Sequence, residues 1–436
     1  MELDFNKGWE FIRENGETET VNLPHDAMLS EERTPFCHNG DKTGYFPGGI
    51  YRYEKKFTLE KEDISKHIEI LFEGVYGHTT VEINGIHAAE HAYGYTEFAA
   101  DISELVHEGE DTVTVHVDNH LEPNSRWYSG SGIYRPVHLI IRDRCYIKWL
   151  TVTTVSVNPA VIEVSTDAEE AQVEIRKEDT VIVSGKPGRF TIPDAKLWSA
   201  ETPFLYTCVL RTETDEKQTE FGIRKLEWSA EKGFLVNEKE TLLRGGCIHH
   251  DHGILGACTF ADAEERRVRI LKKAGYNAIR SSHNPCSRAL LDACDRLGMY
   301  VMDEAFDGWY TPKNYHDYSR DFDENFTKDL ESMVLRDRNH PSVIMYSIGN
   351  EVTETAEERG IALAGEMTEL VHSLDDTRPV TCGVNAMLNI LSSKGQGIYK
   401  DEGEYRPEPL PEITDAKKQR NPVRHSLTRL CRKPTD

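Results

Sequence analysis

The second half of the chain alternates apolar, strand-like runs with amphipathic helical stretches, and this alternation constrains the fold more than any other feature. Parallel strands joined by helical crossovers produce such a pattern, because each crossover returns the chain to the same end of the sheet. No GxGxxG or Walker loop follows any of the strands, so the sequence does not support a nucleotide-binding sheet. We predict strands at residues 241–248, 278–282, 300–303, 343–348 and 380–384, and helices at 262–274, 287–297, 325–336 and 356–374.

The first half of the chain has the pattern of antiparallel β-structure. Short alternating apolar runs are broken by turn signals such as Asn84-Gly85, whose two residues tolerate the positive φ angles of a type I′ hairpin. This pattern predicts a β-sandwich of the jelly-roll type over residues 1–143. A second set of shorter strands over residues 144–226 predicts an immunoglobulin-like β-sandwich.

Composition argues against several classes of partner. The 436-residue chain carries a formal charge of −24, whereas nucleic acids and membrane surfaces are themselves polyanionic, so we expect neither as a partner. The N-terminal stretch MELDFNKGWEF lacks the layout of a signal peptide, and no run of 18 apolar residues occurs. The nine cysteines form no CxxC pair, which favours reduced thiols. We therefore expect a cytoplasmic protein, and the sequence leaves open whether it forms a homo-oligomer.

The last residues differ in composition from the rest of the chain. Residues 416–436 contain seven Lys or Arg and one acidic residue, Asp436. A basic interaction arm would have this composition. We favour the alternative, which is sequence foreign to the fold, such as a shifted reading frame. Residues 393–436 are accordingly predicted to form an irregular, atypical basic tail.

Polar and charged residues follow four successive predicted strands of the second half. The carboxyl ends of strands in a parallel barrel form the face at which βα loops build active sites. Folding alone does not explain polar groups at four strand ends, so we expect a site there. The four segments are His249-His250-Asp251-His252, His283-Asn284-Pro285, Asp303-Glu304 and Asn350-Glu351.

Each of these segments allows more than one interpretation. The histidine cluster contains good zinc ligands, but adjacent side chains on an extended segment point in opposite directions, so we favour hydrogen bonding to a substrate or within the loop. Asp303-Glu304 fits equally well a buried pair that joins neighbouring loops. Glu351 is the best catalytic candidate, because it follows a nearly continuous apolar run in which Gly349 allows close backbone approach.

Four segments, taken in order, resemble those of glycoside hydrolase family 2. The resemblance covers about residues 1–390 and implies a jelly-roll sugar-binding domain, an immunoglobulin-like β-sandwich and a (β/α)8 TIM barrel. Residues 227–392 would form only the N-terminal part of that barrel, which would then be incomplete. The segments are Trp127-Tyr128-Ser129-Gly130-Ser131-Gly132-Ile133-Tyr134-Arg135, Leu243-Arg244-Gly245-Gly246, Arg280-Ser281-Ser282-His283-Asn284-Pro285 followed by Asp303-Glu304-Ala305, and Ser347-Ile348-Gly349-Asn350-Glu351.

The resemblance implies a retaining exo-β-glycosidase that hydrolyses terminal β-linked sugars of an oligosaccharide or other β-glycoside. β-Galactosidase activity is favoured over β-glucuronidase and β-mannosidase activity. Retention requires an acid/base and a nucleophile, two carboxyl groups about 5–5.5 Å apart, and no cofactor or metal. The implied acid/base is Glu351, and the implied substrate-binding residues are Asn350, which would bind the sugar 2-hydroxyl, His250, His283, Asn284, Asp303, Glu304 and Arg126.

The nucleophile of the family lies on the seventh barrel strand, and we find only one convincing strand, at residues 380–384, after Glu351. The later carboxylates Glu402, Glu404, Glu408 and Glu412 lie in a Pro- and charge-rich stretch that is typical of solvated loops. We therefore expect strands six to eight to be absent, as in a truncated or frame-shifted product. Its open sheet edges would aggregate or need a partner. The alternative function is a non-catalytic remnant that binds carbohydrate or a partner chain without turnover.

Overall fold

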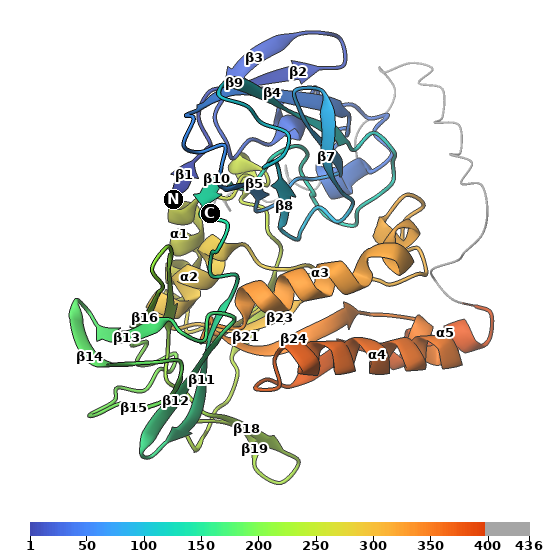
Figure 1. Ribbon diagram of the computed structural model, residues 1–436. Coiled ribbons are helices and arrows are strands. Elements are labelled where there is room, and N and C mark those ends of the chain that lie inside the picture. The colour runs from blue at the N-terminus through green and yellow to red at the C-terminus, as the bar shows by residue number, and fades with distance from the viewer. Residues whose placement is uncertain (397–436) are drawn as a thin grey trace, which may run out of the picture. The chain divides into compact units, whose positions relative to one another are not determined.

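The computed structural model describes residues 1–396, in which two antiparallel β-sandwiches precede a parallel sheet with helices (Figure 1). This is the order of architectures that the sequence predicts. Residues 397–436 of the predicted irregular, basic tail (393–436), with the carboxylates Glu402, Glu404, Glu408 and Glu412, lie outside the described residues.

The first sandwich consists of a six-stranded sheet in the order β3-β2-β4-β9-β6-β7 and a four-stranded sheet in the order β1-β10-β5-β8. Buried aromatic side chains such as Trp9, Phe11 and Phe72 fill the space between the sheets. Asn84 and Gly85 join β6 to β7 with φ angles of +53° and +79°, as a type I′ turn requires. The strands are β1 (Glu2–Asp4), β2 (Trp9–Arg13), β3 (Thr18–Val21), β4 (Ile50–Leu59), β5 (His67–Phe72), β6 (His78–Ile83), β7 (Ile86–His91), β8 (Phe98–Asp101), β9 (Gly109–Asp118) and β10 (Val137–Arg142).

The second sandwich pairs a three-stranded sheet, β11-β12-β15, with a four-stranded sheet, β14-β13-β16-β17. A separate antiparallel sheet, β18-β19-β20, follows it. The strands are β11 (Leu150–Val157), β12 (Ala160–Thr166), β13 (Gln172–Lys177), β14 (Thr180–Gly185), β15 (Gly188–Thr191), β16 (Tyr206–Arg211), β17 (Glu216–Phe221), β18 (Leu226–Ser229), β19 (Gly233–Val236) and β20 (Lys239–Glu240).

The parallel sheet has the order β21-β22-β23-β24-β25, so neighbours in sequence are neighbours in space, as successive βα units of a barrel require. Its strands are β21 (Gly245–Ile248), β22 (Ala278–Ser281), β23 (Tyr300–Glu304), β24 (Val343–Asn350) and β25 (Val380–Gly383). The helices are α1 (Ala261–Lys273), α2 (Arg288–Leu297), α3 (Phe322–Asp337), α4 (Glu358–Leu374) and α5 (Ala386–Ser393). Short 3-10 turns occur at Ala27–Ser30, Gly40–Thr43, Gly253–Leu255, Tyr318–Arg320 and Glu354–Ala356.

The predicted βα elements agree with the structure in type, with shifts at their ends. The first strand begins at Gly245 rather than at residue 241, and β24 continues to Asn350. α2 begins where the Ser287 hydroxyl accepts a hydrogen bond from the Leu290 N–H, and it ends before Gly298, which has a φ of +77°. The sequence analysis did not predict α5, which begins after the capping residue Asn385.

The two sandwiches contact opposite ends of the parallel sheet. Arg135 of the first sandwich donates to the carbonyl of Pro285, 3.0 Å away, in the loop that follows the carboxyl end of β22. Arg224, which follows the second sandwich, donates to the carbonyl of Pro341, 2.6 Å away, just before β24 begins. The first sandwich therefore covers the end of the sheet at which the predicted site residues lie.

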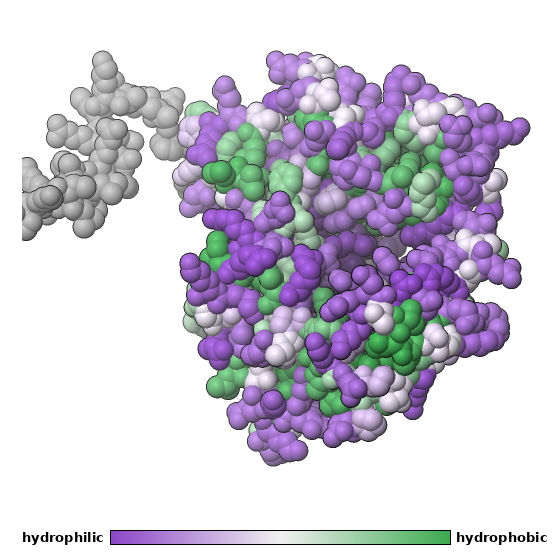
Figure 2. Space-filling model, turned by 90° about the vertical axis from the view of Figure 1, so that its left-hand side faces the viewer, coloured by the Kyte–Doolittle hydropathy of each residue, from purple (hydrophilic) through white to green (hydrophobic). Residues whose placement is uncertain are grey.

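Hydrophilic side chains cover most of the face shown in Figure 2, and hydrophobic residues form separate patches on it. None of the helices in residues 1–396 is both long enough and apolar enough to span a bilayer.

Helix α3 offers a matched test of the barrel packing. Leu330 is completely buried in the core of the barrel, whereas Leu335 on the same helix is 45% exposed. Leu330→Ala should lower the free energy of unfolding by about 2–5 kcal/mol, because it leaves a cavity. Leu335→Ala should change it by no more than about 0.5 kcal/mol. Urea denaturation measures both values, and equal losses would show that α3 does not pack as described.

Candidate active site

A buried hydrogen-bond network joins the carboxyl ends of three strands, with Glu304 at its centre. Glu304 ends β23 and is completely buried. Its carboxylate accepts hydrogen bonds from Arg280 Nε of β22 at 3.0 Å and from Ser347 Oγ of β24 at 2.7 Å. His283 Nδ1 lies 2.7 Å from its other oxygen. Glu304 therefore holds three strand ends in register, which agrees with the structural interpretation of the Asp-Glu pair.

Asn350 is the last residue of β24, and its amide is held from both sides. Its oxygen accepts a hydrogen bond from Arg280 Nη2 at 2.9 Å, and its Nδ2 donates to Asp307 Oδ1 at 3.0 Å. A donor on one side and an acceptor on the other fix the orientation of the amide. An asparagine side chain has two N–H groups and two oxygen lone pairs, so one of each remains for a ligand.

Asp307 links this network to the first sandwich. Arg126 donates to both carboxylate oxygens of Asp307, at 2.9 Å from Nε and also through Nη2. Lys313 Nζ lies 3.2 Å from Asp307 Oδ1, and it also donates to the carbonyl of Asn350 at 2.6 Å. Burial alone would raise the pKa of Asp307, but these partners lower it to about 2. The carboxylate is therefore charged at neutral pH.

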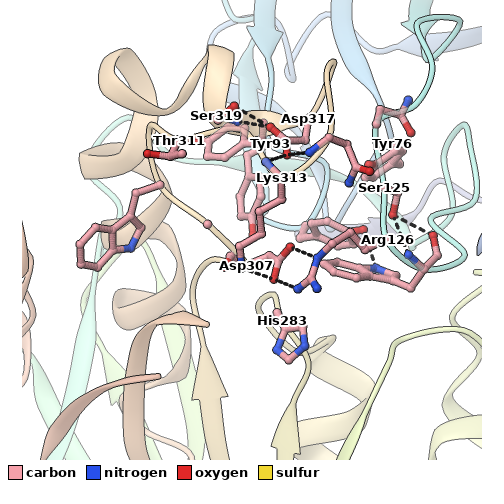
Figure 3. A pocket seen from close by; sticks show the side chains of 17 residues that line it. Tyr76, Tyr93, Ser125, Arg126, His283, Asp307, Thr311, Lys313, Asp317 and Ser319 are labelled. Carbon is pink, nitrogen blue, oxygen red and sulfur yellow. Dashed lines mark hydrogen bonds and ion pairs between the residues drawn. The ribbon is translucent and has the colours of Figure 1, made fainter. Parts of the chain in front are cut away.

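A pocket opens over the Arg126–Asp307 pair, between residues 124–127 of the first sandwich and the loop 307–319 that follows β23 (Figure 3). His283 reaches it from the carboxyl end of β22. Tyrosines form much of the wall on the side of the sandwich. Such a mixture of aromatic faces and convergent polar groups is typical of sites for polar organic ligands. The tyrosines and tryptophans that line the pocket are Tyr76, Tyr93, Tyr95, Trp127, Trp309 and Tyr318.

Glu351 follows the network directly, at the turn after β24. It has a φ of +45°, in the left-handed region that residues other than glycine rarely adopt. Its Oε1 accepts a hydrogen bond from Asn385 Nδ2 at 3.2 Å. The preceding Gly349 approaches Trp309 so closely that an added Cβ would lie 2.8 Å from the indole nitrogen. Backbone strain of this kind clusters at functional sites.

Three models of one protein family match most of this chain. The sugar-binding domain of glycosyl hydrolases family 2 matches residues 35–142, the central domain matches residues 150–224, and the TIM barrel domain matches residues 229–423. The chain belongs to glycoside hydrolase family 2.

Curated relatives of the family 2 chain carry two different activity names. It is 37% identical to the beta-galactosidase BoGH2A of Bacteroides ovatus over 88% of its own length and 54% of that protein. It is 36% identical to a putative beta-glucuronidase of Formosa agariphila over 88% of its length and 40% of that protein. The chain thus spans about half the length of these curated relatives.

Solved structures of the family share the fold. A family 2 member from Bacteroides cellulosilyticus superposes with a TM-score of 0.84 at 36% identity, covering 90% of this chain and 57% of that one. A beta-glycosidase from Bacteroides vulgatus superposes with a TM-score of 0.82 at 34% identity, covering 88% and 54%. The predicted architecture of two sandwiches followed by part of a TIM barrel is confirmed in residues 1–396, which contain five strands of the barrel sheet.

The structure brings five of the eight predicted site residues into one connected set. Hydrogen bonds through Asp307 and Arg280 connect four of them at the strand ends, and the fifth, Glu351, follows Asn350 in the sequence. They are Arg126, His283, Glu304, Asn350 and Glu351.

The other three predicted residues have different surroundings. Asp303 is completely buried on the other side of β23, where its carboxylate accepts from the Cys286 N–H at 3.1 Å. Burial and the nearby Asp337 carboxylate raise the pKa of Asp303 well above its usual range. Asn284 is buried and folds back onto the carbonyl of Ser282, 3.3 Å away. The structure therefore does not bring these two to the pocket: Asp303 faces the opposite side of β23 from Glu304, and the Asn284 amide bonds within its own loop.

His250 faces the first sandwich rather than the pocket. Its Nε2 lies 3.0 Å from the carbonyl oxygen of Ser129, and burial lowers its pKa to about 3, so the imidazole is neutral. The adjacent His249 instead stacks on Trp127, with ring centroids 5.0 Å apart. The two histidines thus point to different partners, as expected for an extended segment. Residues 1–396 contain no cluster of three or more His, Cys, Asp or Glu side chains that could hold a metal ion.

The predicted site residues do not include Arg280, Asp307, Lys313 or Asn385, although each of these contacts one of them. Asp307 and Lys313 lie in a long loop without periodic pattern, and the partner of Asp307, Arg126, lies 181 residues away. Asn385 contacts Glu351 from the loop before α5. One signal was available for Asp307, since it follows Asp303-Glu304 at the end of the same predicted strand.

Asp307→Asn should lower the free energy of unfolding at pH 7 by about 3 kcal/mol or more, because it leaves partly buried Arg126 and Lys313 without their carboxylate. The lowered pKa gives the sign of the pH dependence. The contribution of Asp307 is fully present above its unfolded-state pKa near 3.8 and is lost as the pH falls through 2.

The matched control is Asp323→Asn, which breaks an exposed Asp–Arg pair with Arg359. It should cost about 1 kcal/mol or less. Urea denaturation at pH 7, and again at lower pH through the window from about 4 to about 2, measures both variants. Equal costs for the two variants would contradict the role given to Asp307.

Proposed function

We propose that this chain carries the acid/base half of a retaining exo-β-glycosidase, with Glu351 as the acid/base and terminal β-linked galactose as the favoured sugar. One observation carries the proposal. Glu351 follows directly on an asparagine whose amide is held from both sides, at the carboxyl end of a barrel strand. That end of a TIM barrel is where catalytic residues lie.

The hydrogen bonds of Asn350 suit it to bind a sugar hydroxyl. Arg280 and Asp307 use one lone pair and one N–H of its amide, which leaves one acceptor and one donor. A hydroxyl group can donate to the first and accept from the second. Such a bond to the 2-hydroxyl strengthens as charge develops in the oxocarbenium-like transition state. Because both partners of Asn350 are charged and fixed, its amide needs little reorganisation during the reaction.

In this mechanism Glu351 first donates its proton to the glycosidic oxygen as the bond breaks. It then removes a proton from the water that releases the sugar from the glycosyl-enzyme. His283 and Arg126 would contact sugar hydroxyls from the pocket wall. A retaining pair also requires a second carboxylate as nucleophile. The resemblance puts that residue on a seventh strand, and residues 1–396 contain five strands of the parallel sheet.

The charges of the pocket favour a neutral sugar. Arg126 and Lys313, the Arg and Lys side chains that line it among the described residues, both donate to Asp307. A glucuronate carboxylate would have to compete with Asp307 for them. The name of the relative from Bacteroides ovatus supports galactose, and that of the Formosa relative supports glucuronate as the alternative. β-Mannosides are a third candidate that the site chemistry does not exclude.

Hydrolysis of aryl β-galactoside, β-glucuronide and β-mannoside by the purified chain tests this proposal. Turnover requires a nucleophile that is not on the five described strands of the parallel sheet, and with it in place the β-galactoside should give the highest kcat/KM. Glu351→Gln should lower kcat/KM by about 10²–10⁴-fold, the usual contribution of a general acid/base. The loss should be smaller for an aryl group that leaves without protonation, because such a group does not need the acid.

Glu366→Gln, an exposed glutamate on α4, is the matched control and should keep the wild-type kcat/KM. Turnover that survives intact in Glu351→Gln would rule out its role as acid/base. A folded chain that binds galactose without any turnover would instead support the alternative of a binding function alone.

A further inference from the structure

A second cleft lies at the opposite end of the parallel sheet from the candidate active site. Residues 151–154 of β11 and the segment 222–226 form one side of it, and the segments that follow α3 and α4 form the other. Its volume is about 490 Å³, which is in the range of small-molecule sites. It adjoins Val343, the first residue of β24, whereas Asn350 ends the same strand at the other site.

Two guanidinium groups converge in this cleft. Arg224 Nη2 and Arg378 Nε both donate to the carbonyl of Val343, each at 2.7 Å. Arg224 also donates through Nε to the carbonyl of Pro341, so Nη1 remains for another acceptor. Arg378 forms an ion pair with Asp375, whereas Arg224 forms none with any carboxylate in residues 1–396.

A third guanidinium, that of Arg338, lies beside them and lacks a partner at one atom. Its Nε–H is buried and has no hydrogen-bond acceptor in residues 1–396, and the buried hydroxyl of Thr151 has no hydrogen-bond partner there either. Arg338 and Thr151 line the same cleft, and Asn339, which follows Arg338, bonds to both neighbours of Thr151. Its Oδ1 accepts from the Val152 N–H at 3.0 Å, and its Nδ2 donates to the Leu150 carbonyl at 2.8 Å. Buried polar groups normally have partners, so these two groups are available to a ligand that enters the cleft.

The charge balance of the cleft points to an anion. Arg224 and Arg378 are buried and Arg338 is partly buried, whereas Asp375 is the buried carboxylate that lines the cleft among the described residues. The lining residues Lys225, His372 and Asp376 reach solvent, and Lys225 is already paired with Glu227. Nearby Asp295 is bonded to His340. Burial, and after it the charge of Arg378, lower the pKa of Arg224 to about 9.

We propose that this cleft binds a phosphate group, which Arg224, Arg338 and the Thr151 hydroxyl hold between the second sandwich and the barrel. Guanidinium groups and a hydroxyl supply the charge-assisted hydrogen bonds that phosphate oxygens accept. A phosphate group would also supply acceptors for the two orphan donors. Thr151 belongs to the second sandwich and Arg338 to the barrel. A bound phosphate would therefore strengthen the contact between these two domains. This inference is independent of the glycosidase proposal, since it concerns the other end of the sheet.

Isothermal titration of the full chain with inorganic phosphate, at constant ionic strength, tests the proposal. We expect a saturable, one-to-one isotherm with a Kd below about 10 mM, which we take as the weakest affinity that counts as specific binding. Arg338→Gln should weaken binding at least about tenfold and Thr151→Val severalfold, as loss of a charged and a neutral hydrogen bond predicts. Arg176→Gln, on β13 of the same sandwich and outside the cleft, should leave Kd unchanged.

Glucose 6-phosphate in place of inorganic phosphate distinguishes the source of the group. Tighter binding of the sugar phosphate indicates a phosphorylated metabolite, and tighter binding of inorganic phosphate indicates the free ion. Melting temperatures without phosphate show that each variant is folded. The proposal is overturned if the folded wild-type chain gives no saturable isotherm with either compound, or if Arg338→Gln binds as tightly as the wild type.

Discussion

The site depends on one carboxylate, that of Asp307. It accepts hydrogen bonds from Arg126 of the first sandwich, from Lys313 of its own loop and from Asn350 at the end of β24. Each of these groups would be costly to bury alone, so the carboxylate and its partners are stable only together. Arg126 is 181 residues away in sequence. The pocket therefore exists only when the first sandwich is docked on the barrel, and neither of these two domains contains the site by itself.

The parallel sheet is held at both ends by arginines that reach backbone carbonyls. Arg135 of the first sandwich contacts Pro285 after β22, and Arg224 contacts Pro341 and Val343 at the start of β24. Such contacts fix the strands along their length. A fixed strand end matters for catalysis, because an amide or carboxylate must already point at the reacting atoms before charge develops. The strain at Glu351 fits this requirement, since the surrounding contacts maintain it.

The sequence predicted the barrel strands well because buried parallel strands are apolar runs with polar residues at their ends, as in the segment that becomes β24. It missed α5, which is only eight residues long. Among the site residues, Glu304, Asn350 and Glu351 could be found from strand ends. Asp303 was misplaced because the strand end alone does not show which face a side chain takes. Asp307 follows the same strand end, but its role comes from Arg126 on another domain, and that pairing is not visible in the sequence.

A crystal structure of the chain with a non-hydrolysable 1-thio-β-galactoside tests the central claim, which is that the two units together form a sugar site around Glu351. We expect the sugar ring to lie against the Arg126–Asp307 pair, with its 2-hydroxyl hydrogen-bonded to the amide of Asn350. The glycosidic sulfur should then lie within hydrogen-bond reach of Glu351, about 3 Å or one bridging water away. A sugar bound elsewhere on the chain, or bound in the pocket with its sulfur turned away from Glu351, would contradict it.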